Sequence, residues 1–286
     1  TRTVIPDGGT TTLIYGFGAD RGGQTQFETL VTDANVNASL PGAIKFTYRD
    51  VRELITAVKE QTGTGSYLWT SYAYDALKQI TRVTDDQNNL TQVSYDNLGR
   101  RTSLNNPDVG QTDTVYDLAS NVTAKITANL RAQSQQIAYD HDFTRLKSVT
   151  YPVNTGNNVA YTYGAPGAAN NTAGRLTQIV SQMGVEERTY GKLGEVTYEK
   201  KTVTTFTDPL HPSVFETRYQ YDTFGRLQIL TYPDGEVLTY AYDSGGNLKS
   251  AEGVKGTPSS GGLYRYGYLK GLSYDKFEQR VLLDAG

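Results

Sequence analysis

The sequence has no cysteine and few of the other residues that most often form catalytic or metal sites. Its 286 residues include two histidines, one methionine and one tryptophan. The lack of cysteine excludes disulfides, thiolate nucleophiles and cysteine-ligated zinc. His141 and His211 lie far apart in the sequence, each in a turn-like setting, whereas a metal centre or a catalytic triad needs two or three converging groups. These absences favour a non-catalytic protein without a cofactor.

The chain also lacks an excess of positive charge and long hydrophobic runs. It has 27 basic and 30 acidic residues, for a net charge of -3, which disfavours nucleic acid and anionic membranes as partners. No run approaches the ~18 to 20 apolar residues of a membrane-spanning helix. The chain begins Thr-Arg-Thr-Val without an initiator methionine or a signal-like segment, so we expect it to be an interior piece of a larger protein.

Tyrosine and glycine are abundant, with 22 and 29 copies. Tyrosine favours pleated, half-buried surfaces and glycine favours turns, so the composition predicts an all-β chain. The stretch Tyr219–Leu227, with the sequence Y-Q-Y-D-T-F-G-R-L, shows how the two residues combine. Alternation along a strand puts its two tyrosines on one face. The aspartate can close a turn, the glycine permits a positive φ, and the arginine comes within reach of the aspartate.

This pattern recurs along the chain. The tyrosine that precedes the turn repeats at intervals of 21 to 32 residues, with 21 as the basic period, at Tyr48, Tyr74, Tyr95, Tyr116, Tyr139, Tyr163, Tyr190, Tyr221, Tyr242 and Tyr274. A second turn falls about halfway between successive tyrosines, so each unit has two strands. The period predicts a meander of antiparallel hairpins with roughly 18 to 20 strands. We expect one repeat domain over residues 1–286, with degenerate repeats in 1–45 and recognisable ones in 46–286.

The repeated turn residues are predicted to be structural. A catalytic site needs one specialised copy, whereas a turn needs the same residues each time. The best-preserved copies are Tyr95, Asp96, Gly99, Arg100, Tyr221, Asp222, Gly225, Arg226, Tyr242, Asp243 and Gly246.

Four segments depart from the simple period. Residues 48–61 have apolar residues at helical spacing, but the next unit follows in phase, so we interpret them as a degenerate repeat. Insertions occupy 164–174, 200–212 and 253–262. The last is the most linker-like, yet tyrosine-rich strands resume directly after it, which argues against a domain boundary.

The recurring Tyr-Asp-x-x-Gly-Arg-Leu resembles the YD repeat of the Rhs family, which includes bacterial Rhs toxins, the B and C components of insecticidal toxin complexes, and the teneurins. The resemblance implies a β-sheet that spirals into a hollow shell around a C-terminal effector domain, in a secreted or cell-surface bacterial protein. The implied partners are the rest of the same polypeptide, the enclosed effector and a second shell-forming component. The family's aspartyl self-cleavage motif is not matched, because Asp208-Pro209 lacks the glycine and lies in an insertion.

The tyrosine pairs leave two interpretations open. Packed rings whose hydroxyls bond across repeats would hold the sheet together. Exposed rings at Tyr219, Tyr221, Tyr240 and Tyr242 could instead stack on sugars, which would make the chain a carbohydrate-binding or adhesion module at the cell surface. A β-propeller is the alternative fold, but its blades usually run ~40 residues, about twice the period found here.

Overall fold

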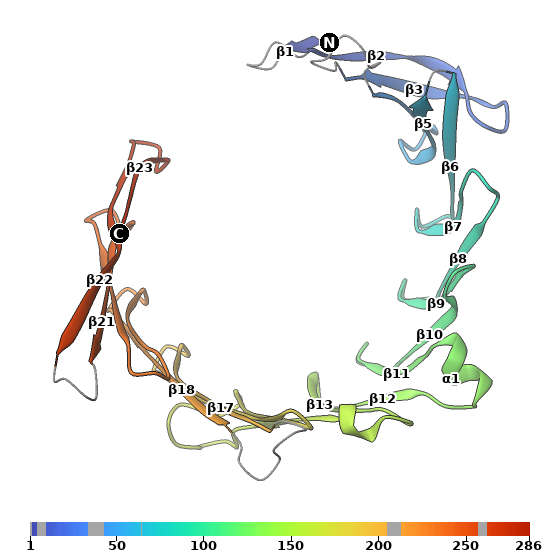
Figure 1. Cartoon of the computed structure of the whole chain (residues 1–286). Coiled ribbons are helices and arrows are strands. Elements are labelled where there is room, and N and C mark those ends of the chain that lie inside the picture. Colours follow the sequence, from blue (N-terminus) through green and yellow to red (C-terminus); the bar gives the residue numbers. More distant parts are fainter. Residues whose placement is uncertain (1, 5–9, 34–42, 64, 205–212, 257–261) are drawn as a thin grey trace. The chain divides into compact units, whose positions relative to one another are not determined.

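The computed structural model describes residues 2–4, 10–33, 43–63, 65–204, 213–256 and 262–286 (Figure 1). Strands make up nearly all of the regular secondary structure in these residues, with one short α-helix and one short 3₁₀ helix among them. The chain forms two compact units, Thr1–Ile137 and Ala138–Gly286. In both units the strands pair antiparallel with their neighbours in sequence, as a hairpin meander requires. The predicted all-β antiparallel fold is therefore confirmed.

The first unit contains eleven paired strands followed by the helix α1, Ala128–Ala132. The strands are β1 Arg2–Val4, β2 Thr10–Ala19, β3 Thr25–Thr32, β4 Ile44–Arg49, β5 Ile55–Gly63, β6 Ser66–Tyr74, β7 Ile80–Thr84, β8 Leu90–Tyr95, β9 Arg101–Asn106, β10 Gly110–Tyr116 and β11 Val122–Ile126.

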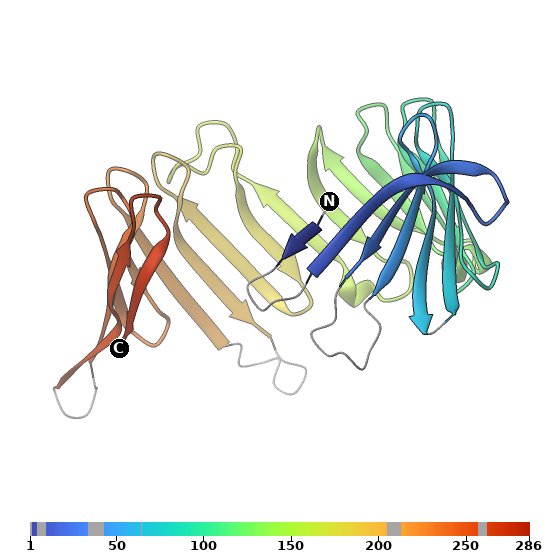
Figure 2. The same cartoon turned by 90° about the horizontal axis from the view of Figure 1, so that it is seen from above.

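The second unit contains the remaining strands, again in a meander (Figure 2). They are β12 Ile137–Asp142, β13 Arg145–Thr150, β14 Val159–Tyr163, β15 Leu176–Ser181, β16 Gly184–Tyr190, β17 Val196–Val203, β18 Ser213–Tyr221, β19 Leu227–Thr231, β20 Val237–Tyr242, β21 Leu248–Gly256, β22 Leu263–Tyr274 and β23 Arg280–Ala285, with the 3₁₀ helix η1 Thr155–Asn157 between β13 and β14.

Most connections along one edge of the sheet in each unit are turns of one type. In the turn at Asp222 the backbone N–H of Asp222 donates to the carbonyl of Arg226 at 2.9 Å, and the N–H of Gly225 donates to the carbonyl of Asp222 at 3.0 Å. We call the turns with this hydrogen-bond pair on the tyrosine side the YD turns, and their side of the sheet the YD edge. They begin at Asp20, Asp50, Asp75, Asp96, Asp117, Gly191, Asp222, Asp243 and Asp275.

A β-bulge precedes the turns at the YD edge. Gln220 pairs with Ile229, but Tyr221 pairs with Leu227, so the returning strand carries one extra residue. The same shift occurs in the hairpins that contain Tyr74, Tyr95, Tyr116, Tyr190 and Tyr242. Because a bulge changes which residues oppose each other, it aims the tyrosine ring at the preceding hairpin.

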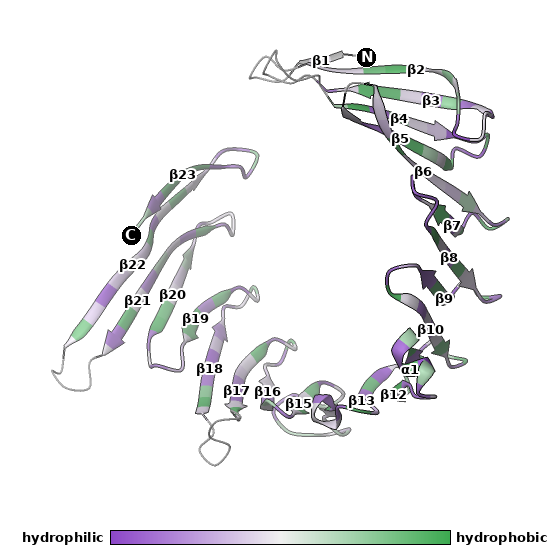
Figure 3. Ribbon diagram, turned by 45° about the vertical axis from the view of Figure 1, so that its right-hand side comes forward, coloured by the Kyte–Doolittle hydropathy of each residue, from purple (hydrophilic) through white to green (hydrophobic). Residues whose placement is uncertain are grey.

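The sheet buries few side chains completely, as expected for a single layer. The largest apolar cluster, in the second unit, consists of Leu230, Leu238 and Ala251. Tyr219, Leu227, Tyr240 and Leu269 pack against it. Figure 3 shows hydrophobic and hydrophilic residues following one another along the strands rather than gathering in one element. Contacts between neighbouring hairpins must therefore supply much of the stability.

Three details of the fold differ from the sequence prediction. The described residues form 23 strands rather than 18 to 20, because β1, β2 and β3 precede the first clear tyrosine. The turn at Asp50 follows Arg49, so Arg49 and not Tyr48 occupies the place before the turn. The helix α1 was not predicted, although Thr127 caps it by accepting a hydrogen bond from the N–H of Leu130.

The irregular segments are now located. Residues 55–63 form strand β5, as the repeat interpretation of 48–61 predicted. In the insertion 164–174, Gly164 bridges to Ala173. Strand β21 runs to Gly256 and pairs with β22 from Leu263, so residues 253–256 belong to a strand, whereas 257–261 lie outside the described residues. Asp208-Pro209 and His211 lie outside the described residues.

Candidate functional site: the YD turns

The aspartate of a YD turn is held by its own turn. Asp222 Oδ1 accepts hydrogen bonds from the backbone N–H groups of Phe224 at 2.9 Å and Arg226 at 3.0 Å. Its Oδ2 accepts a hydrogen bond from Arg226 Nε at 2.7 Å. The Arg226 amide and then its guanidinium hold the pKa of Asp222 below its usual range. Both carboxylate oxygens thus accept hydrogen bonds within the turn, and the carboxylate acts as a charge-assisted cap.

Other YD turns repeat this arrangement. Asp96 accepts from the backbone N–H groups of Leu98 and Arg100 and from Arg100 Nε, the last at 2.7 Å. Asp243 accepts from the backbone N–H of Asn247 at 2.9 Å, and this amide is the main cause that lowers its pKa. The fourth residue in these turns has positive φ, with 78° at Gly99, 75° at Gly225 and 90° at Gly246.

The tyrosine of one repeat is bonded to the repeat before it. The hydroxyl of Tyr242 donates to the carbonyl of Leu227 at 2.7 Å, and the Arg226 guanidinium lies 4.5 Å from the centre of the Tyr242 ring. Arg226 therefore binds Asp222 in its own turn and stacks on the tyrosine of the next, a cation–π contact. Equivalent hydroxyl bonds are made by Tyr74, Tyr95, Tyr116, Tyr163 and Tyr190.

The arginine stack also recurs. The Arg100 guanidinium lies 4.7 Å from the Tyr116 ring centre, and Arg100 Nη1 donates to the carbonyl of Asp117 at 2.8 Å. Arg145 stacks on Tyr163 at 5.0 Å in the second unit. Asp, Arg and Tyr thus form a chain of contacts from turn to turn along the YD edge.

In one turn the carboxylate comes from the fifth position instead of the first. Gly191 stands where other turns have aspartate, and Glu195 stands where they have arginine, asparagine or glutamine. Glu195 Oε2 accepts from the backbone N–H of Leu193 at 2.9 Å. A Cβ added at Gly191 would overlap Glu195 Oε1. The carboxylate of Glu195 therefore occupies the space of the missing aspartate side chain and caps the same turn.

The tyrosines considered for sugar stacking lie half-buried on the sheet. Tyr219 and Tyr240 pack against the Leu230 cluster, and burial raises the pKa of both. Burial also raises the pKa of Tyr221, and the hydroxyl of Tyr242 is bonded as described above. Tyr240 lines an apolar cavity of about 730 Å³ together with Phe215, Tyr232 and Tyr268. Carbohydrate binding by these rings stays a prediction.

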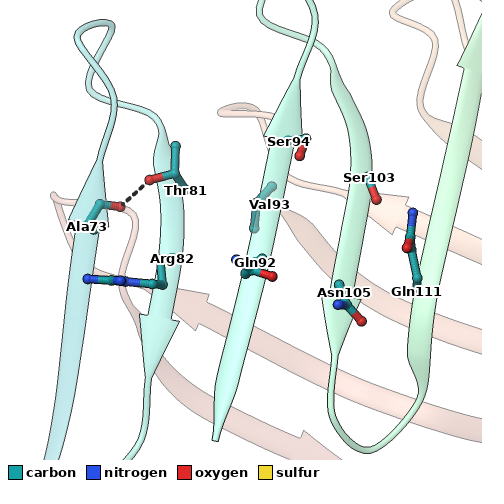
Figure 4. Close-up of a pocket in the computed structure, with 9 residues that line it drawn as sticks. All are labelled: Ala73, Thr81, Arg82, Gln92, Val93, Ser94, Ser103, Asn105 and Gln111. Atoms are coloured by element: carbon teal, nitrogen blue, oxygen red, sulfur yellow. Dashed lines mark hydrogen bonds between the residues drawn. The ribbon is translucent and has the colours of Figure 1, made fainter. Parts of the chain in front are cut away.

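A polar cavity of about 490 Å³ lies on the sheet of the first unit (Figure 4). Ala73, Arg82, Gln92, Asn105 and Gln111 follow one another in register across strands β6 to β10 and line it. The row offers amide and guanidinium groups for hydrogen bonding.

A second polar cavity, of about 540 Å³, is lined by His141, Asp142, Arg145 and Lys147. Arg145 pairs with Asp142, and Lys147 Nζ lies 3.2 Å from Asp140 Oδ2. Among the described residues no group of three or more histidine, aspartate or glutamate side chains could hold a metal ion. In the same part of the chain, no helix has the length and apolar character to cross a membrane.

The match to known families falls on these turns. The family model described as RHS Repeat matches residues 74–108 and 201–237, which include the turns at Asp75, Asp96 and Asp222. Residues 74–108 and 201–237 therefore match the RHS repeat. The resemblance drawn from the sequence is thereby confirmed. No curated protein matches the chain.

Solved structures share the fold of this chain. A crystal structure of TcdB2-TccC3 is 17% identical with a TM-score of 0.71, and the match covers 98% of this chain and 16% of that one. A Photorhabdus luminescens Tc holotoxin pore is 16% identical with a TM-score of 0.73, covering 99% and 15%. A TcdB2-TccC3-Cdc42 structure gives 16%, 0.68, 98% and 16%. This chain therefore spans about a sixth of the length of these solved chains.

Sequence reasoning did not find the partners of the tyrosine and the arginine in the next repeat. The sequence does carry a signal for the tyrosine contact. In three repeats the tyrosine lies 15 residues after the residue whose carbonyl it binds: Tyr95 after Ile80, Tyr116 after Arg101 and Tyr242 after Leu227. That spacing equals the 21-residue period less the six residues from the tyrosine to the start of the returning strand.

Proposed function

We propose that this chain is a non-catalytic wall segment of a larger RHS-repeat protein, which encloses or presents a C-terminal effector domain. The observation that carries the proposal is the recurrence of the tyrosine hydroxyl bond to the preceding repeat, with the full Asp–Arg–Tyr set at the turns of Asp96 and Asp222. Each of these contacts links a hairpin to the next. A hairpin that cannot bury its own faces is stabilised by its neighbours, as in other repeat proteins.

Size and similarity support this role. The sheet resembles TcdB2-TccC3 over 98% of its length but spans 16% of that chain, so a protein of that kind has room for further rows of hairpins and for a separate domain. A wall of net charge -3 would hold an enclosed polypeptide without strong electrostatic binding. We expect the whole protein to be secreted or displayed at the bacterial surface.

Protease protection tests the proposal. The full-length protein that contains this segment is treated with protease, and the rate at which its C-terminal domain is cleaved is compared with the rate for that domain alone. We expect cleavage at least ten times slower in the full-length protein. Replacing Asp222 and Arg226 together by alanine should weaken the wall and raise the rate. Equal cleavage rates in the intact protein and the isolated domain would remove the basis for enclosure.

A further inference from the structure

The apolar cavity of about 730 Å³ in the second unit has aromatic walls. Leu238 and Ala251, which are buried, line its base. Four rings line the rest, namely Phe215 on β18, Tyr232 directly after β19, Tyr240 on β20 and Tyr268 on β22. Phe215 and Tyr268 are 45% and 55% exposed, so their rings are open to a ligand. The volume is in the range of ordinary small-molecule sites.

Two side chains of the cavity, Glu236 and Tyr268, are fixed to each other above Gly253. The Tyr268 hydroxyl donates a hydrogen bond to Glu236 Oε1 at 2.8 Å. A Cβ on Gly253 would lie 2.5 Å from that oxygen and 2.6 Å from a ring carbon of Tyr268. The two side chains therefore occupy the space over this glycine, and a methyl group there would displace one of them. The carboxylate is thus held beside an aromatic ring.

Glu236 gives the described part of the cavity a negative charge. A second carboxylate, Asp234, also lines it. Asp234 Oδ2 lies 2.5 Å from Lys255 Nζ, and its Oδ1 accepts a hydrogen bond from the backbone N–H of Glu236. Lys255 therefore balances the charge of Asp234, whereas the hydrogen bond to Glu236 comes from a neutral hydroxyl. A carboxylate next to the negative faces of aromatic rings favours a positively charged ligand.

The first unit shows the same combination filled by a residue of the chain itself. Lys59 Nζ lies 4.2 Å from the centre of the Tyr67 ring, and 4.9 Å and 5.3 Å from the ring centres of Phe46 and Trp69. Three rings thus surround one ammonium group. In the second unit the described cation–π contacts fall on rings outside the cavity, such as Tyr163 and Tyr198. The rings of the cavity are therefore left for a cation from outside.

We propose that this cavity is a binding site for a quaternary ammonium group, such as the trimethylammonium group of choline. An ammonium or guanidinium ion would need acceptors for three or five N–H groups, and the apolar walls offer few. A trimethylammonium group has no N–H donor, so it enters an apolar cavity with less loss of hydration, and the rings and Glu236 attract its charge. The inference goes beyond the wall function and does not depend on it.

Two ligands of equal shape test the role of charge without changing the protein. The whole chain is titrated with choline and with its neutral isostere, in which a tert-butyl group replaces the trimethylammonium group, and binding is followed by calorimetry. We expect choline to bind about tenfold more tightly. Equal affinities would show an apolar cavity without preference for a cation. Binding of N-acetylglucosamine as tight as that of choline would assign the rings to sugars. Either result would overturn the proposal.

Glu236→Gln locates the site. We expect it to weaken choline binding about tenfold and to leave binding of the neutral isostere unchanged. Glu252→Gln is the matched control, because Glu252 is exposed on strand β21, where it pairs with Arg265 and does not line the cavity. Equal effects of the two variants on choline binding would contradict the assignment. The comparison of the two ligands on the unmodified chain decides the matter if Glu236→Gln does not fold.

Vesicles distinguish two sources of the same chemical group. The chain is sedimented with vesicles of phosphatidylcholine and, separately, of phosphatidylglycerol. Retention on phosphatidylcholine alone, lost in Glu236→Gln, would identify a lipid headgroup as the ligand. Binding of free choline without retention would identify a soluble quaternary ammonium compound. Failure of both the titration and the sedimentation would refute the site, while protection of the effector domain in the full-length protein would be unaffected.

Discussion

The two edges of the sheet carry connections of different kinds. At the YD edge, turns of one geometry recur from Asp20 to Asp275, and the main exception is the insertion 164–174. At the opposite edge the turns at Asp85 and Tyr232 have the same hydrogen-bond pair, but the other connections range from the tight turn between β15 and β16 to the helix α1. The YD edge carries the Asp–Arg–Tyr contacts between hairpins, whereas the opposite edge mainly has to reverse the chain. The constraint on sequence therefore follows the contacts between repeats and not the need to turn.

Lengthening one turn at each edge should give the largest difference. Four Gly/Ser residues inserted between Asn97 and Leu98 separate Asp96 from Arg100, and we expect the larger loss of stability here, because the cap and the charge-assisted pair are both broken. The same insertion between Pro107 and Asp108 should cost about 1 kcal/mol, mostly in loop entropy. Urea unfolding of both variants measures the contrast. Equal losses would mean that the two edges contribute alike.

The reversed turn offers a sharper test within the YD edge. Gly191→Asp should destabilise the second unit by about 2 kcal/mol, because its carboxylate meets that of Glu195 in the same space. Adding Glu195→Arg recreates the Asp–Arg pair of the other turns and should recover most of the loss. Thermal unfolding of the single and double variants reports the coupling between the two sites. Additive effects would show that the two positions do not share one role.

Removing single hydroxyls compares the edges atom for atom. Tyr242→Phe leaves the carbonyl of Leu227 without its partner, so we expect a loss of about 1 kcal/mol. Tyr232→Phe removes a hydroxyl from a tyrosine at the opposite edge that is 39% exposed, and should change stability by less than about 0.5 kcal/mol. Both variants keep the ring, so the difference in urea midpoint isolates the hydroxyl.

Acid should also weaken the YD edge, although by the smallest amount. The turn amides lower the folded-state pKa of Asp222 and Asp243. Their stabilisation is therefore present above the unfolded pKa of about 3.9 and is lost as the pH falls through the lower folded values. Asp222→Asn with Asp243→Asn should flatten the fall in urea midpoint between about pH 6 and pH 3. A fall as steep as in the unmodified chain would place the acid sensitivity elsewhere.

Much of the fold could be predicted because the residues that recur with the period are residues that favour turns. Asp, Gly and Tyr mark most hairpins at the YD edge, and alternation between them indicates strands. The opposite edge was harder, since α1 lies in a connection where local capping by Thr127, and no repeated motif, decides the structure. The misplacement of Tyr48 has a similar cause: Arg49 takes the bulge position, and a one-residue shift puts the tyrosine on the other face.

The contacts between repeats could not be predicted from the sequence, for a different reason. Each involves an arginine, a ring and a carbonyl from two hairpins, and their meeting depends on the bulge before the turn. A register shift of one residue has no signature in composition or spacing, but it decides which hairpin the tyrosine reaches. The turn residues could thus be predicted from the sequence. The contacts that they make with the neighbouring hairpin could be found only in the three-dimensional structure.

The exchange of Gly191 and Glu195 also constrains how such repeats diverge. Starting from an Asp–Arg turn, a glutamate at the fifth position before the loss of the aspartate would place two carboxylates in one space. Losing the aspartate first removes only a cap and leaves room for the glutamate to follow. The order of substitutions is therefore directional, with glycine first. Searches for diverged copies of this repeat should accept a carboxylate at either end of the turn.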